Sequence, residues 1–309
     1  MKKILLIAAI VGAALAGCSK NEGGEPTIKG IVMTTTAEGN IEIYISGIGE
    51  ATIDWGDGTP SETLTLSNPT DLGDVYDNDF PHSYAAAGKK TITITGSITA
   101  LVTGWTEAVS ALNISGVPEL KYLDCCDEDL KSLDLSKNTA LEYLDCGSNQ
   151  LTSLDLSKNT ALEYLNCGDN QLTSLDLSKN TALEELYCNY CELTSLDLSK
   201  NTALRVLQCF NNQLTALDLS KNAVLGWLVC RDNPLFDLDL NNNSPNLSDI
   251  DCSNTDLNLT ALIDIFNALP DRTGTYGNFI RLTNTPGASA SGYSAASAVA
   301  FAKNWNVIP

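Results

Sequence analysis

The sequence contains a single histidine, and only 18 lysines and arginines stand against 38 aspartates and glutamates, which gives a net charge of −20. A protein that binds a nucleic-acid backbone neutralises phosphates with Lys and Arg, so this charge excludes nucleic acid as a partner. The lone His82 also leaves little scope for imidazole catalysis or for a histidine-ligated metal. Hydrophobic residues still make up 43% of the chain, which excludes wholesale disorder and predicts a folded core.

Long apolar runs are scarce, and the N-terminal one is too short for a membrane span. Lys2 and Lys3 precede an apolar run over residues 4–15, whereas a span needs about 20 apolar residues. A charged start, a short apolar run and small residues are typical of a signal peptide. The run ends in Leu15-Ala16-Gly17-Cys18, which resembles the lipobox of bacterial lipoproteins. The alternative is an ordinary secretory signal that happens to contain a cysteine.

The lipobox resemblance implies that residues 1–17 are removed and that Cys18 is acylated, which anchors the protein in a membrane. Residues 18–26 are polar and Gly-rich, so we expect a flexible tether behind the anchor. Ser19 stands where some bacterial lipoproteins carry an aspartate that retains them in the inner membrane. The resemblance therefore implies the outer membrane, with possible exposure at the cell surface.

Residues 27–103 are rich in Thr and Ile and contain stretches in which apolar and polar residues alternate, as in 41–45 and 91–95, with turn residues between them. This pattern predicts a small antiparallel β-sandwich. The motifs at 54–59 (Asp-Trp-Gly-Asp-Gly-Thr) and 82–84 (His-Ser-Tyr) resemble those of PKD-type β-sandwiches. That resemblance implies a spacer or adhesive module of a surface protein, and His82 is expected to be a structural turn residue.

An acidic loop in this region is a candidate Ca²⁺ site because clustered carboxylates suit that ion. It lacks the spacing of an EF-hand, and solvated loop acids are the alternative, so no metal site is assigned. The loop carries Asp71, Asp74, Asp77 and Asp79.

From residue 104 to 256 the chain repeats. Cysteines recur at intervals of 21, five times, and then 22. Each unit is two half-units on the template Leu-x-x-Leu-x-(Leu/Cys)-x-x-Asn, which resembles the nested 21-residue class of leucine-rich repeats in bacterial surface proteins. The resemblance implies a solenoid with parallel strands, and asparagines at the ninth position are expected to turn inward and bond to backbone groups. The recurring cysteines are Cys125, Cys146, Cys167, Cys188, Cys209, Cys230 and Cys252.

So many cysteines in an exported chain suggest disulfides, but the repeat register predicts buried thiols. All seven recurring cysteines take the sixth template position, where the other half-unit has leucine. Cys191 occupies an asparagine position, and Cys126 is predicted to face outward on a strand.

Residues 257–309 are predicted to be a short cap with helices near 257–269 and 295–305, since the open core of a last repeat must be covered. The expected fold is mainly β.

The two half-units differ in how much they vary. The second half-unit repeats Leu-Thr-Ser-Leu-Asp-Leu-Ser-Lys-Asn almost unchanged, which predicts a solvated lattice of Asp and Lys. The first half-unit varies at its outward third, fifth and seventh positions and carries aromatic side chains there. Tyr, Trp and Arg are typical of binding hot spots, although tyrosines that only pack on one another are the alternative. The predicted binding face consists of Tyr122, Tyr143, Asp145, Tyr164, Asn166, Tyr187, Asn189, Gln208, Phe210, Trp227 and Arg231.

These features predict a lipid-anchored binding or adhesion protein with a protein or polysaccharide ligand and no cofactor. A structural envelope spacer is the first alternative, and a Ca²⁺-dependent or glycan-processing accessory protein is a further one. An enzyme is not expected, because the repeats contain no histidine to form a Ser-His or Cys-His pair.

Overall fold

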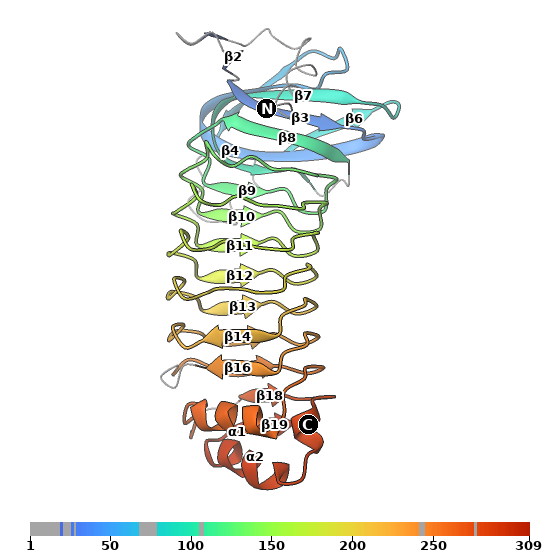
Figure 1. Cartoon of the computed structure of the whole chain (residues 1–309). Coiled ribbons are helices and arrows are strands. Elements are labelled where there is room, and N and C mark those ends of the chain that lie inside the picture. Colours follow the sequence, from blue (N-terminus) through green and yellow to red (C-terminus); the bar gives the residue numbers. More distant parts are fainter. Residues whose placement is uncertain are drawn as a thin grey trace, which may run out of the picture.

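The computed structural model describes residues 19–20, 26–27, 29–67, 79–104, 108–240, 245–274 and 277–309. The signal sequence, Cys18, and Asp71, Asp74 and Asp77 of the acidic loop lie outside the described residues. Figure 1 shows a column, with antiparallel strands at one end, stacked rungs in the middle and helices at the other end. None of the helices in the described ranges is long and apolar enough to cross a membrane.

The N-terminal unit is antiparallel, as the Thr/Ile alternation predicts. Its strands are β3 (Gly30–Thr35), β4 (Gly39–Asp54), β5 (Glu62–Leu66), β6 (Asp79–Tyr84), β7 (Lys90–Val102) and β8 (Val109–Gly116). Within this unit β4 pairs with β5, β6 and β7, and β3 lies between β7 and β8. Alternate apolar residues such as Ile43 and Ile92 point into a core that also holds the fully buried Trp55. A short pair, β1 (Ser19–Lys20) with β2 (Pro26–Thr27), precedes this unit.

The long strand β4 changes register twice against β7, between Ser46 and Gly47 and between Ile48 and Thr52. Gly47 is required at the first irregularity, because a Cβ atom there would lie 2.1 Å from the backbone oxygen of Ser97. The two halves of β4 thereby take different partners, β6 on residues 39–44 and β5 on residues 49–53.

The junction between the two predicted domains contains no break in the sheet. The end of β7 pairs in parallel with β9 (Tyr122–Asp124), so Ala100 lies opposite Tyr122. Strand β8, which the sequence analysis assigned to the repeats, pairs antiparallel with β3 instead. The boundary predicted at residues 103/104 therefore needs correction, since the antiparallel sheet extends to Gly116. Strand β7 covers the open end of the first repeat, as a solenoid requires.

The repeats form a parallel solenoid, which confirms the prediction from their spacing. Each strand pairs in exact register with the next, so that Leu144 lies opposite Leu123 and Leu165. The later second half-units form a separate parallel pair, β14 (Ala216–Leu219) and β16 (Asp237–Leu240). After β9 the main strands are β10 (Tyr143–Asp145), β11 (Tyr164–Asn166), β12 (Glu185–Tyr187), β13 (Val206–Gln208), β15 (Trp227–Val229) and β17 (Asp249–Asp251).

The column of recurring cysteines lies inside the solenoid. All seven have no exposed surface, which confirms that they act as small core residues beside the leucines. The Cys146 thiol contacts the backbone oxygen of Asn166 on the next rung at 3.5 Å. The nine cysteines in the described ranges are all free thiols.

The inward asparagines form the predicted ladders. Asn170 donates from Nδ2 to the carbonyl oxygens of Cys146 and Cys167, at 3.0 and 3.1 Å, and accepts at Oδ1 from the Leu151 N–H at 2.9 Å. In the second half-unit, Asn159 donates from Nδ2 to the carbonyl oxygen of Asn138 at 2.8 Å. These bonds satisfy backbone groups that the coil leaves buried and unpaired.

The C-terminal cap contains the two expected helices, α1 (Leu259–Ala268) and α2 (Tyr293–Ala302), together with a 3₁₀ turn over Pro286–Ser289. Asn258 caps α1 by accepting from the Thr260 N–H at 2.9 Å. The predicted repeats end at residue 256, but β18 (Phe279–Arg281) and β19 (Asn306–Ile308) extend the parallel sheet in register. The period lengthens because each helix is inserted between two successive rungs.

Candidate binding face

The outward side of the strands β9 to β13 and β15, with the turn that follows each strand, is called the variable face here. At the third template position Tyr122, Tyr143 and Tyr164 lie opposite one another, followed by Glu185 and then Val206 on the next strands. The row ends at Trp227, whose side chain is 47% exposed.

The tyrosines stack on one another along this face. Ring centroids are 4.1 Å apart for Tyr122 and Tyr143 and 4.2 Å for Tyr143 and Tyr164, with nearly parallel planes. On the next strand Tyr187, at the fifth position, packs against Tyr164 with its ring tilted and the two centroids 5.4 Å apart. Stacking covers the ring faces, so the tyrosines offer mainly edges and hydroxyl groups to a partner.

Tyr122 takes a different part from the one predicted for it. Its side chain is only 7% exposed, because it packs on Ala100 and Val102 of β7, with Tyr44 beside them. It therefore seals the junction between the N-terminal unit and the solenoid and presents little surface for a ligand. The pairing of β7 with β9, which creates this contact, has no signal in the repeat pattern.

Asp145 and Asn166 also have a structural part that the sequence analysis missed. Each accepts at Oδ1 from the N–H two residues later, Asp145 from Gly147 at 3.0 Å and Asn166 from Gly168 at 3.1 Å. The other Asp145 oxygen accepts from Asn166 Nδ2 at 3.0 Å. Burial raises the pKa of Asp145 to about 6, against the effect of these hydrogen bonds. Both side chains hold their own turns, so we remove them from the candidate site.

The uniform half-unit uses its aspartates in the same way. Asp155 Oδ1 accepts from the Ser157 N–H at 2.9 Å, and Asp176 accepts from Ser178 at the same distance. These backbone hydrogen bonds hold the pKa of both carboxyl groups below the usual value. The constancy of the aspartate position thus has a structural cause, since each Asp from Asp134 to Asp218 caps the turn that ends its rung.

Three later repeats lack these caps and carry larger side chains instead, whereas Asp251 on the rung after them accepts again from its own turn, from the Ser253 N–H at 3.1 Å. At the fifth position Tyr187, Gln208 and Val229 stand where earlier repeats have Asp or Asn, and all three are partly exposed. The Tyr187 hydroxyl donates to Glu185 Oε2 at 2.9 Å. At this position the three side chains do not cap their own turns, so they are available for contacts with a partner.

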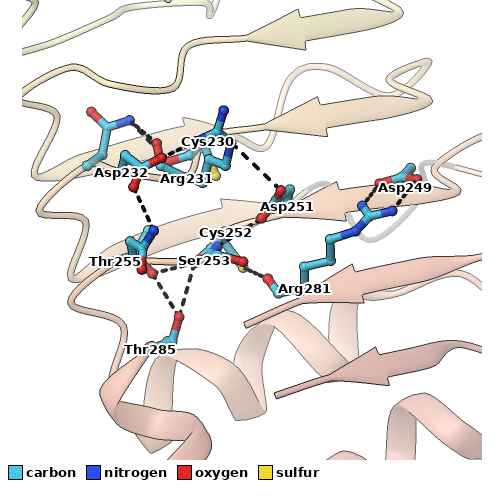
Figure 2. Close-up of polar contacts among 12 residues, drawn as sticks. Cys230, Arg231, Asp232, Asp249, Asp251, Cys252, Ser253, Thr255, Arg281 and Thr285 are labelled. Carbon is cyan, nitrogen blue, oxygen red and sulfur yellow. Dashed lines mark hydrogen bonds and ion pairs between the residues drawn. The ribbon is translucent and has the colours of Figure 1, made fainter. Parts of the chain in front are cut away.

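Phe210 and Arg231 lie together at the seventh position. The Arg231 guanidinium lies over the Phe210 ring at 4.3 Å from its centroid. Figure 2 shows Arg231 between Asp232, to which it is hydrogen-bonded, and Asp251, 4.0 Å away. The predicted Asn189 is partly exposed one rung before Phe210. We call Tyr187, Tyr190, Phe210, Trp227 and Arg231 the aromatic patch.

Tyr190 belongs to this patch although the sequence analysis did not select it. Its ring is 51% exposed and meets Phe210 edge-on, with centroids 5.2 Å apart. It takes the eighth template position, whose backbone is left-handed in every repeat, here with φ 53°. A comparison of the eighth position among repeats would have shown that only this one carries an aromatic residue.

One cluster in the described ranges has donors that suit a metal ion: Asp124, Cys126 and Asp145 each offer an atom within 4.8 Å of the others. The partly exposed Cys126 thiol bonds to the Asp124 carboxylate, and burial together with nearby carboxylates raises its pKa. Without a metal ion the thiol stays protonated and acts as a hydrogen-bond donor to Asp124. Of the acidic loop only Asp79 is described, and it lies exposed at the start of β6.

His82 lies in strand β6 and not in a turn, which corrects its predicted location. Its Nε2 atom is 2.8 Å from Asp57 Oδ2, and its ring stacks on Trp55 with centroids 4.5 Å apart. Hydrogen bonds from Thr59 and His82 lower the pKa of Asp57. These contacts assign His82 to the packing of the N-terminal unit.

Parallel strands in register, the half-unit template and the inward asparagines define a leucine-rich-repeat solenoid. The family model described as "Leucine Rich repeats (2 copies)" matches residues 139–180. No curated protein sequence matches the chain.

Among solved structures, the chain is similar to the functional domain of InlJ from Listeria monocytogenes, which is described as including a cysteine ladder. The two are 28% identical with a TM-score of 0.46, and the match covers 60% of this chain and 49% of that one. It is also similar to YopM from Yersinia enterocolitica, at 29% identity and a TM-score of 0.39 over 46% and 30% of the two chains. The internalin InlF from Listeria monocytogenes is 16% identical, with a TM-score of 0.30 over 68% and 86%. The chain thus spans half or less of the first two structures.

Proposed function

We propose that the protein is a non-enzymatic binding or adhesion protein, anchored by lipid at Cys18 in the outer membrane, that recognises a macromolecule through the variable face. One observation carries this proposal: exposed aromatic side chains gather where the repeats depart from their template. The uniform half-unit departs little, because its aspartates cap the turns.

The composition of the aromatic patch supports binding. Tyr, Trp and Arg dominate protein interfaces, and an exposed Trp227 contributes nothing to the core that the leucines already fill. Leucine-rich-repeat proteins are commonly used for protein binding and adhesion. Burial raises the pKa of the core thiols, as for Cys167, so these cysteines are unsuited to act as nucleophiles.

A spacer function is the second candidate, and the junction favours it. The pairing of β7 with β9 makes one sheet of the N-terminal unit and the solenoid, so the two are joined directly by paired strands. The N-terminal unit is then proposed to be a PKD-type module that holds the variable face away from the membrane. Spacing and binding are compatible in one molecule.

The anchor is tested by the variant Cys18→Ala, whose product should lose acylation and leave the membrane fraction. Fractionation of the envelope, with the parent chain as control, measures this. Membrane association equal to that of the parent would refute the anchor without touching the binding proposal.

The binding face is tested by screening the mature protein on arrays of extracellular proteins and glycans and titrating the hits by calorimetry. Tyr187→Ala combined with Trp227→Ala should weaken binding more than tenfold, since a hot-spot aromatic typically contributes about 2 kcal/mol. Asp155→Ala combined with Asp176→Ala, on the uniform half-unit, should change affinity less than about threefold. Equal losses from both pairs would refute the assignment, and an absence of hits would leave the spacer function.

A further inference from the structure

A second row of residues follows the edge of the variable face, at the left-handed turn after each strand. Backbone hydrogen bonds join neighbouring turns. The Asp169 N–H donates to the carbonyl oxygen of Asn189 at 2.8 Å, and the Tyr190 N–H donates to that of Phe210 at 3.0 Å. The left-handed conformation suits Asp and Asn, whose short polar side chains tolerate it. The row consists of Asp127, Ser148, Asp169, Tyr190, Asn211, Asp232 and Asn254, with φ between 50° and 56°.

Tyr190 is the exception in this row. A bulky side chain is disfavoured in the left-handed region, and burial does not compensate here, because half of the ring is exposed. The same repeat also has Cys191 in place of the ladder asparagine and Tyr187 in place of the turn cap. Three departures from the template in one repeat, none of which the fold needs, mark this repeat as the centre of a functional surface.

The charges near Tyr190 are predominantly negative. Asp169 precedes it in the row and Glu192 follows two residues later, both exposed. Within the described part of the chain, neither carboxylate has a hydrogen bond or an ion pair with a neighbouring side chain. Arg231, whose guanidinium lies over the neighbouring Phe210 ring, is already paired with Asp232 and Asp251. An exposed ring, with one unpaired carboxylate on the preceding turn and another two residues along the chain, suits a cationic side chain.

We propose that Tyr190, Asp169 and Glu192 dock a lysine or arginine side chain from a basic segment of a partner polypeptide. The inference rests on the proposed function of the variable face and adds the chemistry of its partner. The net charge of −20 complements such a segment and steers its approach. A neutral glycan offers no positive charge to Asp169 and Glu192, so the charges of this site favour the polypeptide.

The test uses a phage-displayed library of random dodecapeptides, selected on the mature protein, followed by titration of synthetic copies of the enriched peptides. Enriched sequences should be rich in Lys and Arg. Tyr190→Asn should weaken them more than tenfold while raising the denaturation midpoint, because Asn suits the left-handed turn. Asp169→Asn should weaken them at least threefold. The matched control Asp127→Asn, which removes the same charge two repeats away, should change affinity less than twofold.

Several outcomes would overturn the inference. These are enrichment of acidic or neutral peptides, an absence of enrichment, or unchanged affinity of Tyr190→Asn. Equal losses of peptide affinity in Asp127→Asn and Asp169→Asn would show that the net negative charge attracts the peptides without a specific site. A protein ligand that depends on Tyr187 and Trp227 but not on Tyr190 would overturn this inference and keep the proposed function. If a glycan binds the parent protein but not Tyr190→Asn, the ligand of this site is a glycan, and the proposal of a basic polypeptide is wrong.

Discussion

Replacing Cys191 by asparagine should make the protein more stable, because Cys191 interrupts the ladder of inward asparagines. Its thiol contacts the carbonyl oxygen of Cys167 at 3.4 Å, and the Leu172 N–H is directed at its sulfur. Sulfur is a weak donor and a weak acceptor. In the next repeat Asn212 makes both bonds with its amide, from Nδ2 to the Cys188 oxygen at 2.8 Å and at Oδ1 from the Leu193 N–H at 3.0 Å.

The size of the effect follows from these two bonds. A buried hydrogen bond contributes about 0.5–1.5 kcal/mol net, so restoring both in Cys191→Asn contributes roughly 1–3 kcal/mol. Part of this is offset, because the thiol is buried and its sulfur packs as a small hydrophobic group. We expect a net gain of about 1–2 kcal/mol. The reverse change, Asn212→Cys, should cost a similar amount.

Urea unfolding followed by circular dichroism measures both variants against the parent. The midpoint should rise for Cys191→Asn and fall for Asn212→Cys, with the slope unchanged. A loss of stability in Cys191→Asn, or no effect of Asn212→Cys, would show that the ladder bonds contribute little and would refute the reasoning. It would also weaken the case that the repeat around Tyr190 sacrifices stability.

Two further predictions concern titration and thiols. Burial raises the pKa of Asp145 to about 6, so the folded protein binds this proton more tightly than the unfolded chain does. The contribution of Asp145 to stability should therefore improve as the pH falls from about 7 to 4, and urea midpoints of Asp145→Asn should lack this trend. Thiol titration of the denatured protein without reductant should find at least seven free groups, whereas the native protein should react at almost none of them; two or fewer after denaturation would mean that the column is cross-linked.

The sequence predicts the solenoid in detail because the repeat fixes it. A constant interval of 21 residues sets the strand register, so the buried cysteines and the inward asparagines follow from template positions alone. The cap was harder. Ile250, Ile280 and Val307 share one register, but inserted helices stretch the intervals to 30 and 27 residues and hide the period. Three-residue strands between helices leave too short a pattern to recognise.

The site was predicted less well than the fold, for two physical reasons. Tyr122 is buried by β7, a strand that belongs to another unit, and such long-range pairing leaves no local signal. The turn-capping part of Asp145, in contrast, was accessible, since Asp155 holds the same fifth position in the uniform half-unit. The prediction treated every outward side chain as free to bind a ligand. A short polar side chain such as that of Asp145 instead forms a hydrogen bond with its own backbone.

The arrangement of the chain explains why one repeat can depart so far from the template. The stability of a solenoid is roughly a sum over repeats and their contacts, so uniform neighbours can support one weakened rung. Around Tyr190 those neighbours supply intact ladders at Asn170 and Asn212 and a continuous core of leucine and cysteine. A strained tyrosine in this place stays folded and exposed, and it is held at a fixed distance from the other aromatic side chains. Rigid positioning of that kind limits the entropy that a partner must lose on binding, which is where a repeat protein gains specificity from a few altered residues.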